Sequence, residues 1–265
     1  MTIHQAVLLG ILQGFTELLP ISSSAHLYIF PWLLGWHYQG LSFDVALHLG
    51  TLVGLVAFLL PDWIKLIGGT ISGEPKMRRL LLYIIIACIP GALFGALLEK
   101  QAEDVFRSPS IIAITMSSFG LLLLFADIYG RRNEKGVEDV GWKEAIIIGL
   151  SQALAIIPGV SRSGATMTAG LFTGLKKEES ARFSFLLATP IIAGAALWEG
   201  RKIVSLMGVE LLSLIFGFVS AAIASYIAVW FLLRFLRKGS FIPFVVYRFI
   251  FALLVLLFII INSYR

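Results

Sequence analysis

The sequence has 265 residues, of which 58% are hydrophobic and only 14% charged, and its mean hydropathy is +0.90. About a quarter of the residues in a soluble globular protein are charged, so this composition excludes an ordinary soluble domain. The net charge of +5 is better explained by basic loops on the cytoplasmic side of a membrane than by nucleic-acid binding.

Uncharged stretches recur along the chain at lengths that suit a membrane. They cover residues 45–61, 80–98, 108–126, 183–198 and 211–233. A helix of about 20 residues crosses the hydrocarbon core of a bilayer, with a working range of about 17–25. We therefore predict an all-α, multi-pass protein of the cell membrane, with residues 1–265 forming a single integral membrane domain.

Two segments differ from ordinary spans. Residues 7–34 contain two glycines, two prolines, three successive serines and a glutamate. Residues 143–175 contain Pro158-Gly159 followed by Ser161-Arg162-Ser163-Gly164. Proline and glycine leave backbone groups that lipid cannot satisfy, so such segments must line a cavity or be buried in protein. We predict that each is a re-entrant helix hairpin that enters and leaves the bilayer on one side.

The two halves of the chain resemble each other in sequence. The aligned stretches, 139 residues apart, are Gly10–Gln13 with Gly149–Gln152 and Ser22–Ala25 with Ser161–Gly164. This similarity predicts two repeats, about 1–130 and 141–265, joined by a polar linker over residues 131–140. At an offset of 140, Phe43–Leu47 aligns with Phe183–Leu187 and Gly54 with Gly194, and later segments match only in hydropathy.

The distribution of basic residues predicts the topology. If neither hairpin crosses the bilayer, the spans are residues 43–61, 80–98, 109–128, 183–198, 209–233 and 241–262. The loops on one face then hold 14 Lys and Arg residues and the opposite face holds 5, whereas hairpins that crossed fully would give 11 and 8. The positive-inside rule favours the sharper division, so we predict six transmembrane helices, two re-entrant hairpins and both termini outside the cytoplasm. Three crossings in each half make the second repeat inverted relative to the first.

Polar residues gather at the two predicted hairpins. They are Gln13, Glu17, Ser22, Ser23, Ser24 and His26 in the first, and Ser161, Arg162, Ser163, Gly164 and Thr166 in the second. Inverted repeats with broken helices place their binding site near the bilayer midplane, where the halves meet. An ionisable group at the centre of a membrane helix costs roughly 2.5–3.5 kcal/mol on insertion scales, so Glu17 and Arg162 are expected to serve a function.

This set of residues suits phosphate chemistry. Arg162 offers a planar fork that matches phosphate oxygens, and the serine and threonine hydroxyls and the N–H groups of a helix N-terminus add donors. His26 can act as a general acid or base, and a neighbouring serine can act as a nucleophile. Glu17, together with Gln13, can hold a divalent cation against the substrate's phosphates.

Structural roles for the same residues remain open alternatives. Glu17 and Arg162 can form an ion pair that only locks the halves together, and His26 can be a hydrogen-bonded core histidine. Ser22–Ser24 can be helix caps or close-packing residues, which are common at membrane helix interfaces.

Four further polar residues are assigned no catalytic role. His48 and Asp44 open the span after the first hairpin and are expected to be interfacial or packing residues. Asp127 and Arg248 lie near the ends of their spans, from which such side chains are expected to reach the lipid headgroups.

Two stretches, Gln13–His26 and Pro158–Thr166, resemble the signature pair of the undecaprenyl-diphosphatase family, also called the bacitracin-resistance family. Phe241–Arg248 is similar to a third stretch of that family. The resemblance covers essentially the whole chain. It implies hydrolysis of undecaprenyl pyrophosphate to undecaprenyl phosphate and inorganic phosphate. This reaction recycles the lipid carrier of cell-wall polymers and lowers the amount of bacitracin's target.

The resemblance also implies roles for particular residues. It makes Glu17 the acidic residue tied to metal and catalysis, Ser23 the nucleophile and His26 its acid–base partner, and it implies dependence on Mg²⁺ or Ca²⁺. Direct attack by water activated by His26 stays an open alternative. Ser161, Arg162 and Thr166 would hold the pyrophosphate, in a cleft open to the extracytoplasmic side.

The sequence departs from the family pattern at two positions. Gln13 stands where some members have a second glutamate, which leaves one carboxylate for a metal. Ala25 stands where the family usually has glycine, and its methyl group adds bulk to the turn beside His26.

A transporter or flippase of polyprenyl phosphate lipids is the alternative function, because inverted repeats with broken helices also build transporters. A transporter needs anion donors such as Arg162, but not a serine and a histidine beside a carboxylate, and this cluster favours the enzyme. The expected partners are a polyprenyl pyrophosphate lipid and the bilayer, with no nucleic acid. A homodimer is one option for the assembly.

Overall fold

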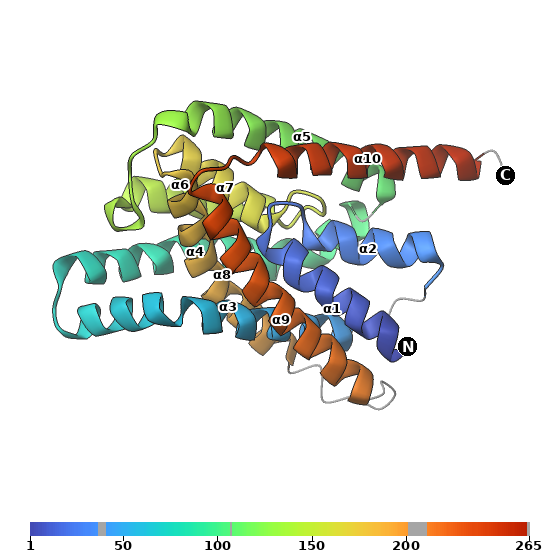
Figure 1. Ribbon diagram of the computed structural model, residues 1–265, viewed down its shortest axis with the longest axis horizontal. Helices are drawn as coiled ribbons and strands as arrows, with labels where there is room; N and C mark the ends of the chain where they lie inside the picture. The colour runs from blue at the N-terminus through green and yellow to red at the C-terminus, as the bar shows by residue number, and fades with distance from the viewer. Residues whose placement is uncertain (37–40, 107, 201–210, 264–265) are drawn as a thin grey trace.

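The computed structural model describes residues 1–36, 41–106, 108–200 and 211–263 and forms ten α-helices over them (Figure 1). The helices are α1 (Ile3–Leu18), α2 (Ser23–Leu34), α3 (Leu41–Ile71), α4 (Pro75–Phe106), α5 (Pro109–Tyr129), α6 (Trp142–Leu154), α7 (Arg162–Phe172), α8 (Lys177–Gly200), α9 (Leu211–Leu236) and α10 (Ile242–Ser263). Two short 3₁₀ helices, Gly130–Arg132 and Val137–Asp139, lie in the linker between α5 and α6. No β-strand forms within the described ranges, so the predicted all-α class is confirmed.

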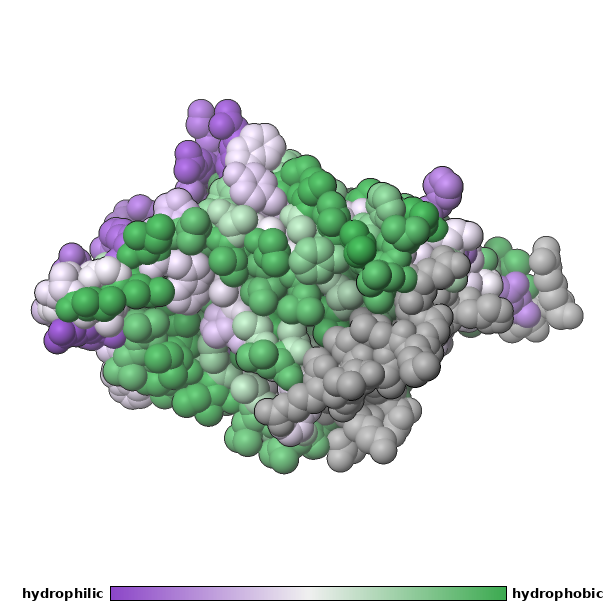
Figure 2. Space-filling model, turned by 90° about the horizontal axis from the view of Figure 1, so that it is seen from below, coloured by the Kyte–Doolittle hydropathy of each residue, from purple (hydrophilic) through white to green (hydrophobic). Residues whose placement is uncertain are grey.

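Six helices are long and apolar enough to cross a membrane. Their apolar stretches are Phe43–Ile71, Pro75–Leu98, Pro109–Arg132, Lys177–Trp198, Leu211–Leu236 and Ile242–Asn262. These correspond in order to the six predicted spans, and the protein is therefore a multi-pass membrane protein. Hydrophobic side chains cover much of the face seen in Figure 2, and hydrophilic ones gather mainly toward one end and the upper edge. Such a surface suits contact with lipid.

The helices extend farther than the predicted spans on one side. Residues 62–79 were predicted as a loop, but α3 continues through Pro61 to Ile71 and α4 begins at Pro75. Contacts with other segments stabilise the extension, since Asp62 pairs with Arg182 at 2.5 Å and Lys65 with Glu138 at 2.7 Å. Tertiary contacts thus outweigh the tendency of an internal proline to end a helix.

The four remaining helices are short and form two consecutive pairs. α1 and α2 have 16 and 12 residues, and α6 and α7 have 13 and 11. At 1.5 Å per residue, they measure roughly 16–24 Å, less than the ~30 Å hydrocarbon core of a bilayer. α1 ends at Leu18, just before Pro20, which has no backbone N–H to continue the helical hydrogen bonding.

Close packing around α9 depends on glycine. α1 and α3 both pack against α9. A Cβ atom on Gly14 of α1 would lie 2.6 Å from the Ala221 carbonyl oxygen, and one on Gly54 of α3 would lie 2.1 Å from the Ala222 carbonyl oxygen. Small residues allow helix backbones to approach this closely in membranes, where van der Waals contact drives association.

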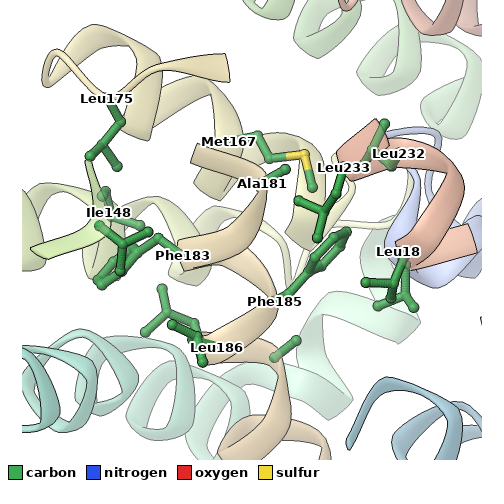
Figure 3. Packing of buried hydrophobic residues seen from close by; sticks show 14 of the residues in the cluster. Leu18, Ile148, Met167, Leu175, Ala181, Phe183, Phe185, Leu186, Leu232 and Leu233 are labelled. Atoms are coloured by element: carbon green, nitrogen blue, oxygen red, sulfur yellow. The ribbon is translucent and has the colours of Figure 1, made fainter. Parts of the chain in front are cut away.

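α8 lies at the centre of the largest hydrophobic cluster. Its side chains Phe183, Phe185 and Leu186 are almost fully buried. Figure 3 shows them among Ile148 of α6, Met167 of α7 and residues of α1 and α9. In addition, α5 packs against α10, and α4 packs against α6 and α8. The two short-helix pairs are thereby held inside a frame of long helices.

Both chain termini lie at the same end of the molecule, and the α3–α4 connection lies at the opposite end (Figure 1). Four of the five basic residues predicted for the end with the termini lie outside the described residues: Arg107, Arg201, Lys202 and Arg265. The arrangement of the helices agrees with an even number of crossings.

The α3–α9 contact makes a testable prediction. Replacing Gly54 with leucine should push the two helices apart and destabilise the fold by about 3 kcal/mol or more, because the new Cβ would overlap a backbone carbonyl. Thermal unfolding in detergent measures the effect. Gly68→Leu is the matched control, since a Cβ on Gly68 of the same helix meets no atom within 4 Å. Equal unfolding temperatures for the two variants would contradict the proposed role of Gly54.

Candidate functional site

The turns before α2 and α7 have the same unusual backbone. Ser22 and Ser161 have φ values of 74° and 73°, and no other non-glycine residue in the described ranges has a positive φ. Their hydroxyl oxygens lie 3.2 Å from those of Ser24 and Ser163, respectively. Non-glycine residues adopt this region rarely and at a cost of order 1–3 kcal/mol, so its recurrence 139 residues apart marks two turns built to one design.

Glu17 lies at the centre of the contacts between the two turns. Its Oε1 is 2.8 Å from Nη2 of Arg162, so the carboxylate from the first turn region pairs with the guanidinium that begins α7. Its Oε2 accepts hydrogen bonds from the Ser23 hydroxyl and, at 3.3 Å, from Nε2 of Gln13. Nε2 of His48 lies 3.7 Å from the same oxygen. The structure thus brings Gln13, Glu17, Ser23 and Arg162 together, as predicted.

Two polar atoms beside this carboxylate are buried and have no hydrogen-bond partner among the described residues: Nη1 of Arg162 and Oε1 of Gln13. Buried polar groups nearly always have partners, so each such atom requires an explanation. One is a cationic donor suited to a phosphate oxygen, and the other is an acceptor suited to a cation or a hydroxyl. Together they favour a bound group that carries both anionic oxygens and a counter-ion.

His26 lies behind the first turn and is fully buried. Its Nδ1 is 2.7 Å from the Ser22 carbonyl oxygen, and its Nε2 is 2.6 Å from the Tyr247 hydroxyl. The ring also stacks on Phe251 at a centroid distance of 4.4 Å. Both ring nitrogens therefore have partners. Among the described residues, no hydrogen bond joins His26 to Ser23. The sequence did not single out Tyr247 as a site residue.

The remaining predicted residues of the second turn support its shape. Ser161 accepts a hydrogen bond from the Gly164 N–H at 3.1 Å, and the Ser163 hydroxyl donates to the Leu19 carbonyl oxygen at 3.0 Å. The Thr166 hydroxyl donates to the Arg162 carbonyl oxygen and lies 2.6 Å from that of Ser184. These contacts connect the second turn to the first turn and to α8.

Arg248 binds both turns, so the prediction that it reaches the headgroups is wrong. Its side chain is fully buried. Nη1 donates to the Pro20 and Val160 carbonyl oxygens at 3.1 and 3.2 Å, and Nη2 donates to that of Gly159 at 2.9 Å. Nε donates to the Met116 carbonyl oxygen at 2.9 Å. The sequence did contain a signal for this burial, namely an arginine at the seventh position of an apolar helix. The free-energy cost of a charge inside a membrane, which singled out Arg162, applies equally to Arg248.

Asp127 also stays inside the protein, contrary to the prediction. Only 1% of it is exposed, and its Oδ1 binds Nζ of Lys177 at 2.7 Å and the Phe241 N–H at 2.9 Å. The carboxylate stays inside because Lys177 of α8 and the Phe241 N–H supply partners for it there. His48 was expected to have only an interfacial or packing role, yet it faces Glu17. No feature of the sequence around it indicates that contact.

The residues fit a weakly held cation. Among the described residues there is no group of three or more His, Cys, Asp or Glu that could hold a metal alone. Mg²⁺ is usually bound in enzymes by one or two carboxylates together with water and substrate phosphates. The Glu17 carboxylate and the unpartnered Oε1 of Gln13 supply two oxygen ligands of this kind.

Comparison with known proteins shows similarity over nearly the whole chain. Residues 6–254 match the family described as bacitracin resistance protein BacA. The undecaprenyl-diphosphatase of Moorella thermoacetica is 52% identical over 257 residues, which cover 96% of this chain and 97% of that protein. Those of Pelotomaculum thermopropionicum and Caldicellulosiruptor bescii are 49% identical over 257 residues (97% and 96% coverage) and 44% identical over 265 residues (99% and 100%). The matched region includes every residue of the candidate site.

Replacing Arg248 with methionine tests its role in holding the turns. The variant leaves four buried carbonyl groups without their donor, so we expect a loss of about 3 kcal/mol or more in the free energy of unfolding. The unfolding temperature in detergent reports the loss. Arg79→Met is the control, because Arg79 is exposed and donates to a carbonyl oxygen of its own helix, that of Pro75. If both variants unfold like the wild type, Arg248 does not hold the turns.

Proposed function

We propose that this chain, which belongs to the family of the bacitracin resistance protein BacA, hydrolyses undecaprenyl pyrophosphate to undecaprenyl phosphate and inorganic phosphate. The observation that carries the proposal is the Glu17–Arg162 pair with its unpartnered guanidinium nitrogen, held between two turns of a membrane protein. The relatives named as undecaprenyl-diphosphatases supply the substrate class.

Binding depends on the guanidinium of Arg162. With the polyprenyl tail in the bilayer, the pyrophosphate enters between the two turns, and Nη1 of Arg162 donates to one of its oxygens. The charge spread over these oxygens is the main obstacle to phosphoryl transfer, and fixed cationic donors offset it. The N–H groups that begin α2 and α7 add positive potential in the same region.

Ser23 is proposed as the nucleophile. Its hydroxyl donates to Glu17, which can therefore accept the proton as Oγ attacks the terminal phosphorus. The bond from that phosphorus to the bridging oxygen breaks, and undecaprenyl phosphate leaves with the bond's electron pair. Water then hydrolyses the phosphoserine and releases inorganic phosphate. His26 holds the Ser22 carbonyl group and so positions the turn that carries Ser23.

A divalent cation, Mg²⁺ or Ca²⁺, is proposed to bind between Glu17, Gln13 Oε1 and the substrate. When bound, it would neutralise further charge on the pyrophosphate oxygens. His48 also lies beside this position, with its Nε2 3.7 Å from Oε2 of Glu17.

The central prediction concerns phosphate release from undecaprenyl pyrophosphate by purified protein in detergent. Arg162→Ala should lower turnover about 100-fold or more, because it removes a fixed donor to the transferred group. Chelation of divalent cations should abolish release, and added Mg²⁺ or Ca²⁺ should restore it. Lys238→Ala, an exposed change at the end of α9, should leave turnover unchanged. Folded wild-type protein that binds the lipid but releases no phosphate would refute the hydrolase.

The serine route makes a separate prediction. Ser23→Ala should lose nearly all turnover, and quenching the wild type during turnover of substrate labelled in its terminal phosphate should leave label on Ser23. Ser24→Ala is the control, since the Ser24 hydroxyl contacts Ser22 rather than Glu17. Near-normal turnover of Ser23→Ala, without a labelled protein, would instead support direct attack by water.

We also propose that the chain is a single domain of two inverted repeats, residues 1–130 and 141–265, with the short-helix pairs as re-entrant hairpins. The matching turns at Ser22 and Ser161 support this proposal. The four short helices support it too, because each is shorter than a full membrane span. The helix contacts support it too, because α1 and α3 pack against α9 as α6 and α8 pack against α4. Under this proposal both termini lie outside the cytoplasm.

Accessibility labelling tests the topology. In a Cys88→Ser background, a cysteine at exposed His4 should react with an impermeant thiol reagent added to intact cells. A cysteine at exposed Glu134, in the linker, should react only after the cells are permeabilised. Labelling of both positions from the same side would contradict the odd number of crossings in the first repeat.

A further inference from the structure

A cavity lined by arginines lies away from the two turns. It has a volume of about 110 Å³ and lies between α3, α8 and the C-terminal end of α9. Its lining residues are Phe58, Arg182, Trp230, Leu233, Arg234 and Arg237. Three of these six are arginines and the other three are apolar or aromatic. None of them belongs to the candidate active site.

Arg182 presents an unsatisfied donor in this region. Its Nη1 pairs with Asp62 at 2.5 Å, but its Nε is buried and has no hydrogen-bond partner in the part of the chain that the structure describes. Asp62 also lines a neighbouring cavity of about 180 Å³ that shares Arg182 with this one. A buried guanidinium N–H without an acceptor is unfavourable, so the arrangement favours an anion that the protein itself does not supply.

The charges around the cavity are not balanced. Arg237 pairs with Glu178 at 3.0 Å, and Arg182 pairs with Asp62. Arg234 has an aromatic partner, Trp230, whose ring centroid is 6.0 Å from its guanidinium carbon, but no carboxylate partner among the described residues. Three guanidinium groups are thus offset by two carboxylates, and one positive charge remains for a ligand.

The arginines of the cavity lie near the ends of their helices. Arg234 is two residues before the end of α9, and Arg182 is five residues after the start of α8. Trp230 is half exposed, and tryptophan at such a position is typical of the membrane interface. Phe58 and Leu233 supply an apolar wall beside the arginines. A ligand that is anionic at one end and apolar at the other fits this lining.

We propose that this cavity binds the phosphodiester headgroup of an anionic membrane phospholipid, at a site separate from the one that takes the pyrophosphate. Arginine matches phosphate oxygens with paired N–H donors, and basic pockets between transmembrane helices on the cytoplasmic side are known to hold anionic headgroups. The phosphate accepts from Arg182 Nε and from Arg234, while the acyl chains follow the lipid-facing surface beside Phe58 and Leu233.

The test measures thermal unfolding of detergent-purified protein against the concentration of short-chain phosphatidylglycerol. A ligand that binds only the folded state raises the unfolding temperature in a saturable way. Phosphatidylcholine of the same chain length, whose quaternary ammonium group neutralises its phosphodiester, should stabilise the protein only at a much higher concentration. Arg234→Gln should raise the half-saturating concentration about tenfold or more, because it removes a charged donor to the phosphate. Lys238→Gln removes one positive charge from the same helix end without touching the cavity, and should behave as the wild type.

A second variant and a second readout complete the experiment. Arg237→Gln, whose side chain is largely exposed, should weaken the lipid effect without affecting folding. Native mass spectrometry should retain one phosphatidylglycerol on the wild type and none on Arg234→Gln. Phosphate release by both variants without added lipid should equal that of the wild type, so this proposal and the hydrolase proposal fail independently.

Three results would overturn the proposal. Equal stabilisation by phosphatidylcholine would show that the lipid acts only as a solvent. Equal weakening by Lys238→Gln would reduce the effect to general electrostatics. Stabilisation by inorganic phosphate with the same dependence on Arg234 would make the site one for a free anion rather than a lipid.

Discussion

One guanidinium, that of Arg248, holds together the parts of the structure from which the site is made. It donates to carbonyl groups of the first turn, the second turn and α5, and the two turn residues, Pro20 and Gly159, lie outside any helix. In a membrane these carbonyl groups have no water to bind, so a turn is tolerated only where protein donors reach it. The two broken segments therefore depend on a residue from the last helix, and so does the spacing between Glu17 and Arg162.

The Glu17–Arg162 pair and the unpartnered atoms beside it serve different ends. A buried ion pair contributes little net stability, because desolvation offsets most of the attraction, whereas removing one partner is strongly unfavourable. The pair is thus a way of keeping two charges inside the membrane until a substrate arrives. Nη1 of Arg162 and Oε1 of Gln13 have no hydrogen-bond partner within the described ranges, which leaves them for ligands. Leaving these two atoms without partners destabilises the protein locally, and the close packing of the long helices elsewhere offsets that free energy.

Most of the architecture could be predicted from the sequence, since spans and broken segments leave strong signals in hydropathy, proline and glycine. The residues around Glu17 were predicted for the same reason, as charge inside an apolar segment is rare. His48 and the burial of Asp127 could not be predicted, because each depends on a partner from another helix. The helical continuation past Pro61 escaped prediction similarly. Arg248 could have been found by applying to the last helix the argument used for Arg162.

The long sequence separation of these contacts has a consequence for biosynthesis. Glu17 precedes Arg162 by 145 residues, and Pro20 precedes Arg248 by 228. At a translation rate of about 5–20 residues per second, the α1–α2 segment waits roughly 7–30 s for Arg162 and longer for Arg248. Until then Glu17 has only the partners that its own half of the chain supplies, and the Pro20 carbonyl group lacks its guanidinium donor. The site therefore cannot take its final form while the first helices are being inserted, and it is completed only when the last helix is made.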